Sequence, residues 1–450
     1  MIGGVMHRQH RRFINGLSLV GIVCLAASCT SSGSSAVSSK TKAASSPSGT
    51  TYIGLVAPFT GASAVIGSIQ SAGAYPAAAE INAAGGVLGH KVGIKIVNSQ
   101  GDPADALPAV QQFIATTGNI LGVIGPGTNS ATTLVPVMTR SKIVMMSQAG
   151  ESLYNNNTDP YFWRPVPPDS ANGVAMSLYA KSQGWTRAAT VFGSDSGSQG
   201  DLPGVLAGAK ALGINVVTQV NVPLDQPSYA AQVARVLAAK PQVIFTETDP
   251  VTAGTFFGEL VQQSGGKLVH VVSTANGVTL PYVTTFAHAV GSTLFTKMFT
   301  AASNEPSSSN PAGTDFNKWL AQSGANVPKP SQWVGNPHAQ AVYSFAIIEA
   351  LAADAAGSTQ GSAYHNEIKS IVNPGSGKTT VYTYAQGLKL IKEHKAIRYV
   401  PPDGPLDFNK YNNAGNGEVI QTFSPTTNKF VNLQTLSASK INAVKVTGVI

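Results

Sequence analysis

Short apolar runs alternate along the chain with segments in which apolar residues recur every three or four positions, beginning at Tyr52. Runs of this length are typical of buried strands, and the periodicity between them is typical of amphipathic helices. In the first half of the chain, the sequence predicts strands at "YIGLVAP", "KVGIKIV", "ILGVIG" and "KIVMMS". The segments between them predict helices over about 62–83, 103–116 and 130–140.

A second series of the same kind follows. Its predicted strands are "AATVFGS", "NVVTQV", "QVIFTET" and "LVHVVS", with helices near 200–212, 228–239 and 251–264. Buried strands joined by helices form parallel sheets that are covered on both faces. The pattern therefore predicts an α/β fold of two consecutive units. Because ligands of such sheets bind at the carboxyl ends of the strands, we expect a binding site in the cleft between the units.

The N-terminus has the pattern of an export signal. Arginines at positions 8, 11 and 12 precede the apolar stretch "GLSLVGIVCLAAS", which is too short to span a bilayer. The stretch ends in "LAASC", which resembles a bacterial lipobox, although Ala26 stands where leucine is usual. The resemblance implies cleavage before Cys29 and acylation of Cys29, for example with palmitate. A plain secretory signal cut nearby is the alternative.

The expected product is a body displayed on the extracytoplasmic face of the cell membrane. Residues 1–28 would be the signal peptide, and the serine-rich residues 29–50 would form a flexible tether. The two cysteines of the chain, Cys24 and Cys29, both belong to this region, so the folded body is expected to contain no disulfide and no thiolate site.

Composition narrows the range of partners. Charged residues make up only 11% of the chain, so the surface must consist mainly of uncharged polar groups. The net charge is +8, but three of the basic residues lie in the predicted signal and no dense basic cluster follows, so nucleic acid is not an expected partner. The eight histidines lack metal-ligand spacing, and we expect neither a metal nor a cofactor.

Several segments carry a family resemblance in order over about 51–435. They are "YIGLVAPFTGASAVIG", "EINAAGGVLG", "DPADALPAVQQFI", "GVIGPGTNSATTLVPVM", "DPYFWRPVPPD" and "GPLDFNKYNNAGNGEVIQTF". Together they resemble the type I periplasmic binding proteins, in the branched-chain amino acid or leucine-binding branch. The resemblance implies two Rossmann-like lobes with parallel sheets, joined by three crossover strands, that close on a small solute like a Venus flytrap. It also implies delivery to the permease of an ABC importer, with no chemical reaction.

The resemblance also suggests how the chain divides. The first lobe would comprise residues 51–167 and 300–400. The second lobe would comprise residues 168–299 together with the closing strands and tail at 401–450.

In the first lobe, two loops carry candidate ligand contacts. Thr128, Asn129 and Ser130 follow the strand "LGVIG" and open a helix, where hydroxyls and free N–H groups favour a carboxylate or another electron-rich group. The alternative is that Thr128 or Ser130 only caps the helix. By resemblance, Ala149 and the neighbouring Gly150 and Glu151 of "SQAGE" would add further contacts.

The second lobe departs from the amino acid binders of this family. Asn276 stands where those proteins usually have an acidic residue, and Ile66 of the first lobe stands where an aromatic residue is usual. Glu247 and Asp249 in "TETDP" could meet a cationic group of the ligand from another direction. Their alternative role is that of solvated or helix-capping carboxylates.

The stretch "VFGSDSGSQGD" allows two interpretations. Asp195, Ser196 and Gly197 spell the tripeptide around the nucleophile of chymotrypsin-like proteases, so one alternative is an anchored serine hydrolase that uses Ser196. A nucleophilic serine needs a base, and no histidine lies within 70 residues of Ser196 in sequence. By resemblance, Asp195, Gly197 and Ser198 belong to a binding loop in which Gly197 replaces a tyrosine lid.

The expected function is capture of a small polar solute, with a ligand sensor of the same fold as a variant. The sequence leaves the solute open among polar amino acids, amides and small organic acids or amines.

Overall fold

The computed structural model describes residues 49–61, 63–304, 310–415, 417–444 and 446. The predictions for the signal peptide and the acylated Cys29, and nearly all of the predicted tether, lie outside these residues. The first strand already begins at Thr50.

The first sheet has five parallel strands in the order β2-β1-β3-β4-β5. They are β1 (Thr50–Ala57), β2 (Lys91–Asn98), β3 (Ile120–Ile124), β4 (Met145–Met146) and β5 (Phe162–Trp163). The prediction is confirmed for the first three strands, but "KIVMMS" contributes only its two methionines. The reason is that Lys142 adopts a left-handed conformation that ends the preceding helix, and the Ile143 N–H bonds back to the Met138 carbonyl.

Helices cover both faces of this sheet. Residues of α1 and α11 share one hydrophobic core with it, and residues of α2 and α3 share another. The helical segments associated with this lobe are α1 (Ala64–Ala83), α2 (Pro103–Thr116), α3 (Thr128–Ser141), η1 (Ser152–Asn156), α10 (Pro311–Gln322), η3 (Pro330–Trp333), α11 (Pro337–Ala356), α12 (Gly361–Tyr364), α13 (Glu367–Val372) and α14 (Tyr384–Lys392). Two short parallel strands, β11 (Thr379–Val381) and β12 (Ile397–Tyr399), complete it.

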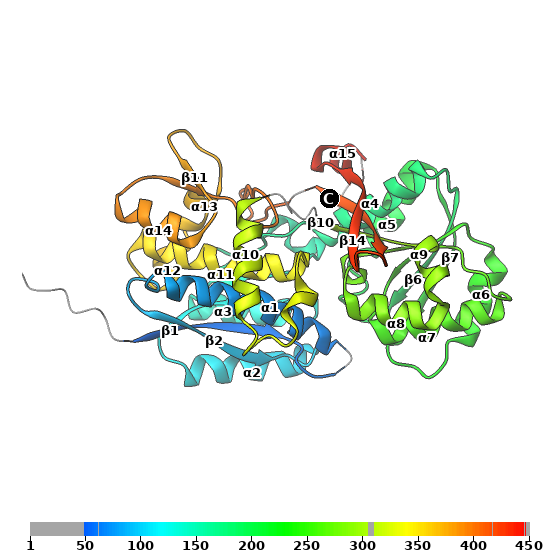
Figure 1. The fold of residues 1–450 in the computed structure, drawn as a ribbon, viewed down its shortest axis with the longest axis horizontal. Coiled ribbons are helices and arrows are strands. Elements are labelled where there is room, and N and C mark those ends of the chain that lie inside the picture. Colours follow the sequence, from blue (N-terminus) through cyan, green and yellow to red (C-terminus); the bar gives the residue numbers. More distant parts are fainter. Residues whose placement is uncertain (1–48, 62, 305–309, 416, 445, 447–450) are drawn as a thin grey trace, which may run out of the picture. The chain divides into compact units, whose positions relative to one another are not determined.

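Helix α11 is the central helix of this lobe and lies alongside α1, although the two are far apart in sequence (Figure 1). It is the one helix in the described part of the chain that is long and apolar enough to cross a membrane, and 89% of its apolar stretch is buried inside the protein. The two helices approach closely at Gly73, where a Cβ atom would lie 2.3 Å from the Ala339 carbonyl oxygen. A side chain at this position would force them apart.

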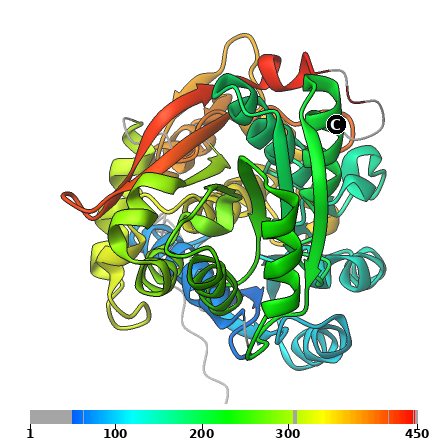
Figure 2. The same ribbon diagram turned by 90° about the vertical axis from the view of Figure 1, so that its right-hand side faces the viewer.

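The second sheet has the order β14-β13-β10-β9-β8-β6-β7. Its strands are β6 (Arg187–Gly193), β7 (Asn215–Val222), β8 (Val243–Glu247), β9 (His270–Ser273), β10 (Phe299–Asn304), β13 (Glu418–Ser424) and β14 (Lys429–Leu436). Strands β6 to β10 are parallel, as predicted, whereas β13 and β14 form an antiparallel hairpin at one edge (Figure 2).

Helices cover both faces of the second sheet as well. They are α4 (Asp169–Ser182), α5 (Leu202–Leu212) and α15 (Ala438–Asn442) on one side and α6 (Ala230–Ala239), α7 (Pro250–Gln263), α8 (Leu280–Val290) and α9 (Ser292–Met298) on the other, with the short η2 (Ala275–Gly277) after β9. The two-lobed α/β fold with parallel sheets is therefore confirmed.

The chain crosses from one lobe to the other three times, after β5, after β10 and after β12. Two segments lie in a different lobe from the predicted one. Residues 300–304 pair with β9 and β13 in the second sheet, because β10 extends to Asn304. Leu406 and Phe408 pack in the core of the first lobe.

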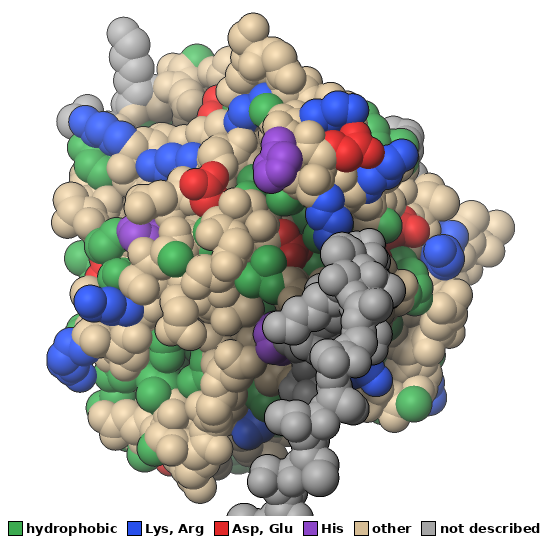
Figure 3. Space-filling model, turned by 90° about the vertical axis from the view of Figure 1, so that its left-hand side faces the viewer, with side chains coloured by type: hydrophobic (Ala, Val, Ile, Leu, Met, Phe, Trp, Pro, Cys, Tyr) green, Lys and Arg blue, Asp and Glu red, His purple; other side chains and the backbone are tan. Residues whose placement is uncertain are grey.

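Charged side chains are sparse on the face shown in Figure 3, where most of the surface is uncharged. Within the described residues the ion pairs are Lys318–Asp315 and Lys395–Glu393, both on the surface. Exposed pairs of this kind contribute little to stability. The fold therefore depends on its apolar cores and on buried hydrogen bonds.

The core of the first lobe contains one carboxyl group whose replacement should stabilise the fold. Glu349 of α11 is 0% exposed, and neither of its carboxyl oxygens has a hydrogen-bond partner. Burial raises its pKa well above the ordinary value. The folded protein therefore holds this proton more tightly than the unfolded chain does, so the contribution of Glu349 to stability is greatest below about pH 4.3 and is lost as the pH rises.

We expect Glu349→Gln to remove this loss, because the amide cannot ionise. At pH 8 the variant should be more stable than the parent by about 1–3 kcal/mol, and at pH 5 by less. Urea unfolding at both pH values measures the difference. An equal difference in unfolding free energy between variant and parent at pH 5 and at pH 8 would contradict the raised pKa of Glu349.

Candidate functional site

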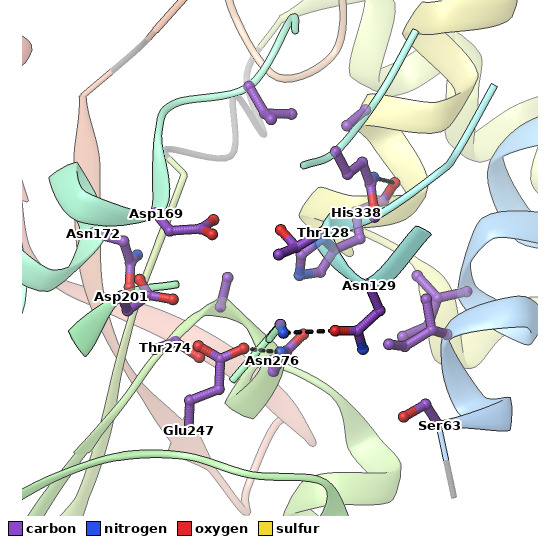
Figure 4. A pocket seen from close by; sticks show the side chains of 18 of the residues that line it. Ser63, Thr128, Asn129, Asp169, Asn172, Asp201, Glu247, Thr274, Asn276 and His338 are labelled. Atoms are coloured by element: carbon purple, nitrogen blue, oxygen red, sulfur yellow. Dashed lines mark hydrogen bonds between the residues drawn. The ribbon is translucent and has the colours of Figure 1, made fainter. Parts of the chain in front are cut away.

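Loops at the carboxyl ends of strands from both sheets line a cavity of about 170 Å³ (Figure 4). The wall on the first-lobe side includes Ile66, Gln70 and the start of α3, and the wall on the second-lobe side includes Glu247 and Asn276. A smaller cavity of about 80 Å³ adjoins the first and shares several wall residues with it. This is the position that the α/β pattern predicts for a ligand.

Most of the residues predicted from the sequence lie on these walls. The larger cavity is lined by Ile66, Thr128, Asn129, Ser130, Gly197, Glu247 and Asn276. The smaller cavity adds Asp195, Ser198 and Asp249.

The start of α3, from Gly127 to Ser130, lies on the wall of the larger cavity. Gly127 is the N-cap residue, and no side chain caps the helix. The Ser130 hydroxyl instead donates to the Gly127 carbonyl over 3.3 Å. Capping is therefore not the role of Thr128 or Ser130, and Thr128 lies on the cavity wall opposite Asp169 (Figure 4).

The three residues predicted from "SQAGE" lie outside both cavity walls. Ala149 is buried in the core beneath the first sheet. Gly150 lies against Asp169, since a Cβ at Gly150 would come within 1.6 Å of the Asp169 carboxylate. The Glu151 carbonyl accepts a hydrogen bond of 2.9 Å from Arg164. The loop thus contacts Asp169, which lines the larger cavity, and Arg164, which does not.

The stretch around Ser196 makes hydrogen bonds from the second lobe to the first. The Asn129 side-chain oxygen accepts from the Ser196 hydroxyl at 2.6 Å and from the Gly197 N–H at 2.7 Å. The Asn129 amide nitrogen lies 3.4 Å from the Asp195 carboxylate. We call these three contacts the Asn129 latch. An amide oxygen cannot act as a general base, so this geometry does not activate Ser196 as a nucleophile.

Asp249 and Asn276 have defined partners in the second lobe. One carboxylate oxygen of Asp249 accepts hydrogen bonds from the N–H groups of Val251 at 2.8 Å and Thr252 at 3.0 Å, so Asp249 caps α7. The Asn276 amide donates to the Glu247 carboxylate. Asn276 thus orients Glu247 at the cavity wall.

Sequence reasoning missed three more carboxyl groups on the wall. Asp169, Asp201 and Glu418 lie beside Glu247, and we call these four residues the carboxyl cluster. Figure 4 shows Asp169, Asp201 and Glu247 facing the cavity from the second lobe, across from Asn129. Asp169 begins α4, Asp201 precedes α5 and Glu418 begins β13. Each thus stands at the start of a helix or strand, and this position is the sequence signal that could have identified them.

Burial makes ionisation of this cluster costly. It raises the pKa of Asp169 and Asp201 well above the ordinary value, and the neighbouring Glu247 carboxylate raises both further. Burial also raises the pKa of Glu247, and it raises that of Glu418 to about 8. The cluster therefore holds protons near neutral pH when nothing positive is bound beside it.

Comparison with known proteins identifies the relatives of this fold. A model of the family described as periplasmic binding protein matches residues 50–384. The Leu/Ile/Val-binding protein BraC3 of Rhizobium johnstonii is 33% identical over 96 residues. That match spans 21% of this chain and 26% of the relative, so it covers only a minor part of that protein's length.

Solved structures resemble nearly the whole described body. The leucine binding protein LivK of Thermotoga maritima has a TM-score of 0.68 at 15% identity, with 86% of this chain and 99% of that chain covered. An ABC transporter solute binding protein of R. palustris in complex with 4-hydroxybenzoate has a TM-score of 0.68 at 18% identity, with 86% and 97% covered. A fatty acid ABC transporter substrate-binding protein of Thermomonospora curvata has a TM-score of 0.69 at 16% identity, with 88% and 95% covered.

At these identities the structural matches establish the fold alone. The family match, in contrast, extends over well more than half of the 450 residues and includes the first sheet and the parallel strands β6 to β10 of the second. The chain belongs to the periplasmic binding protein family.

Proposed function

We propose that this protein is the extracytoplasmic substrate-binding lipoprotein of an ABC importer. It captures a small polar solute between its two lobes and presents the closed form to the permease. The observation that carries the proposal is the cavity itself, whose walls come from strand ends of both lobes. A solute that contacts both walls favours the closed arrangement, because it gains interactions there that it lacks when the lobes are apart.

The relatives support binding rather than a reaction. The similar solved proteins are described as binding leucine, 4-hydroxybenzoate or fatty acid, and several are described as parts of ABC transporters. The cavity of about 170 Å³ has a suitable size for a solute not much larger than benzene, because an apolar cavity of about 150 Å³ already holds benzene. The hydroxyl, amide and carboxyl groups on its walls favour a solute with polar groups.

We expect the purified protein to carry a small solute in this cavity. Ile66 lines both cavities, so Ile66→Trp should fill the space and abolish binding. Native mass spectrometry detects the bound mass, and the solute at 100 times its Kd should stabilise the parent by about 2.7 kcal/mol. Ile96→Trp is the matched control, because Ile96 is 50% exposed and lies on neither cavity wall. Equal loading of the parent and Ile66→Trp would contradict the proposal.

The Asn129 latch should contribute to closure. Asn129→Ala removes contacts with three residues of the second lobe, each hydrogen bond being worth about 0.5–1.5 kcal/mol net. We expect roughly tenfold weaker solute binding, which corresponds to about 1.4 kcal/mol, and a larger radius of gyration in solution scattering. Ser196→Ala removes one of these bonds and should have a smaller effect. Unchanged affinity and size in Asn129→Ala would refute a role in closure.

Anchoring through Cys29 is tested by fractionation of cells. Cys29→Ser should move the protein from the membrane to the soluble or secreted fraction and abolish incorporation of labelled palmitate. Cys24→Ser is the control, because Cys24 lies inside the predicted signal, five residues before the predicted acylation site. Membrane retention of Cys29→Ser with undiminished palmitate label would exclude acylation at this position.

A further inference from the structure

The two cavity walls differ in charge. The second-lobe wall carries the carboxyl cluster of Asp169, Asp201, Glu247 and Glu418, whereas the described residues that line either cavity include no lysine and no arginine. The whole chain has only 21 acidic residues, so four of them in one cavity is a concentrated charge. We propose, resting on the proposed solute-binding function, that the solute is a small organic cation whose amine or guanidinium groups bind the carboxyl cluster.

Unpartnered acceptors on the walls provide an independent reason. Glu418 is 0% exposed, and its Oε2 accepts from the Asn172 amide at 3.0 Å while its Oε1 has no hydrogen-bond partner. The same hydrogen bond fixes the orientation of the Asn172 amide, whose Oδ1 is also unpartnered although Asn172 is only 7% exposed. Buried polar atoms are nearly always hydrogen-bonded, so these oxygens call for N–H or O–H donors from a ligand.

The first-lobe wall adds an acceptor of the same kind. Gln70 is 1% exposed, and its amide nitrogen donates to the Gly125 carbonyl at 2.8 Å. This bond leaves Gln70 Oε1 without a partner. Three buried acceptors on two sides of one cavity match a solute that presents several N–H groups.

The nearby basic side chains offset the charge of the cluster only in part, because burial and the Glu247 carboxylate raise the pKa of Asp169 more than Arg164 lowers it. Arg164 is 1% exposed, and its guanidinium donates to the Glu151 carbonyl at 2.9 Å and to Asn155 Oδ1 at 2.6 Å. It lines neither cavity. His338 lies on the first-lobe wall, but burial lowers its pKa to about 4, so its imidazole is neutral. A bound cation would therefore supply the positive charge that the wall lacks.

The remaining wall limits the size of the cation. Ile66, Ile69 and Val166 provide apolar surface beside the carboxyl cluster, and the cavity volume is about 170 Å³. A short alkyl chain can pack on this surface while its charged end reaches the carboxylates. The expected class is thus an aliphatic amine, diamine or guanidinoalkylamine.

Binding of a cation should release protons. Carboxyl groups hold protons in the ligand-free cavity, and a bound cation favours their ionised form. The carboxyl and imidazole groups that line the two cavities are those of Asp169, Asp201, Glu247, Glu418, Asp195, Asp249 and His338. Arg164 and Glu151 line neither cavity, but their charges act on Asp169. Since the carboxyl groups must lose protons for tight binding, affinity should fall as the pH decreases from 8 to 6.

The test is calorimetry with defined probes on the purified protein. We expect 1,4-diaminobutane or agmatine to bind at least 100-fold more tightly than 1,4-butanediol, which has the same chain length without charge. Titrations in two buffers of different ionisation enthalpy should reveal proton release. Glu418→Gln and Asp201→Asn should each weaken binding of the cation at least tenfold.

Matched controls separate binding from folding. Asp105→Asn should bind like the parent, because Asp105 is exposed in the first turn of α2, on neither cavity wall. The melting temperature of ligand-free Glu418→Gln should equal or exceed that of the parent, because the amide avoids the cost of a buried charge. If Glu418→Gln instead melted at a lower temperature than the parent, its weaker binding would be assigned to a destabilised fold. The affinity of Asp201→Asn for the cation would then decide whether the carboxyl cluster binds it.

Two results would overturn the inference. Binding of leucine or benzoate that Ile66→Trp abolishes, without binding of either cationic probe, would retain a solute-binding function and refute a cationic solute. Equal affinity for the diamine and the diol would also refute it. Failure of the proposed function itself would instead appear as loading that does not depend on Ile66.

Discussion

The constraint on which the site depends is the burial of four carboxyl groups, Asp169, Asp201, Glu247 and Glu418, on one cavity wall without a cation among them. Buried carboxyl groups this close together cannot all ionise, so some of them stay protonated unless a positively charged group binds beside them. The second lobe brings these groups together, because Glu247 ends β8, Asp169 and Asp201 stand at the starts of α4 and α5, and Glu418 begins β13 at the same edge of the sheet. Burying these carboxyl groups together costs folding free energy, and a positively charged ligand that binds them accounts for the arrangement.

The Asn129 latch connects the second lobe, which carries the carboxyl cluster, to the first lobe. It places the start of α3 against the loop that follows β6, with donors and acceptors matched across the cleft. Such contacts are individually weak, so they allow the lobes to separate. Weak closure in the absence of solute and tighter closure around it are what a solute-capturing protein requires.

The sequence predicted most of the fold, because the apolar runs and the helical periodicity are local signals. It predicted Asn129 and Glu247 as ligand contacts because each lies near the carboxyl end of a predicted strand, Glu247 as the last residue of β8 and Asn129 in the segment that leads from β3 into α3. It missed Asp169, Asp201 and Glu418 because only the folded chain brings these distant positions together. It also proposed Ala149, Gly150 and Glu151 as ligand contacts, whereas these residues line neither cavity. Gly150 packs against Asp169 and the Glu151 carbonyl binds Arg164, and no local pattern reveals these contacts.

The most direct measurement is a crystal structure of the protein with the solute that it carries after purification. The account predicts electron density for a small molecule between the start of α3 and the carboxyl cluster, within hydrogen-bond distance of Glu418 and Asn172. Density for the solute at another surface, with the cleft collapsed and filled by side chains, would contradict it.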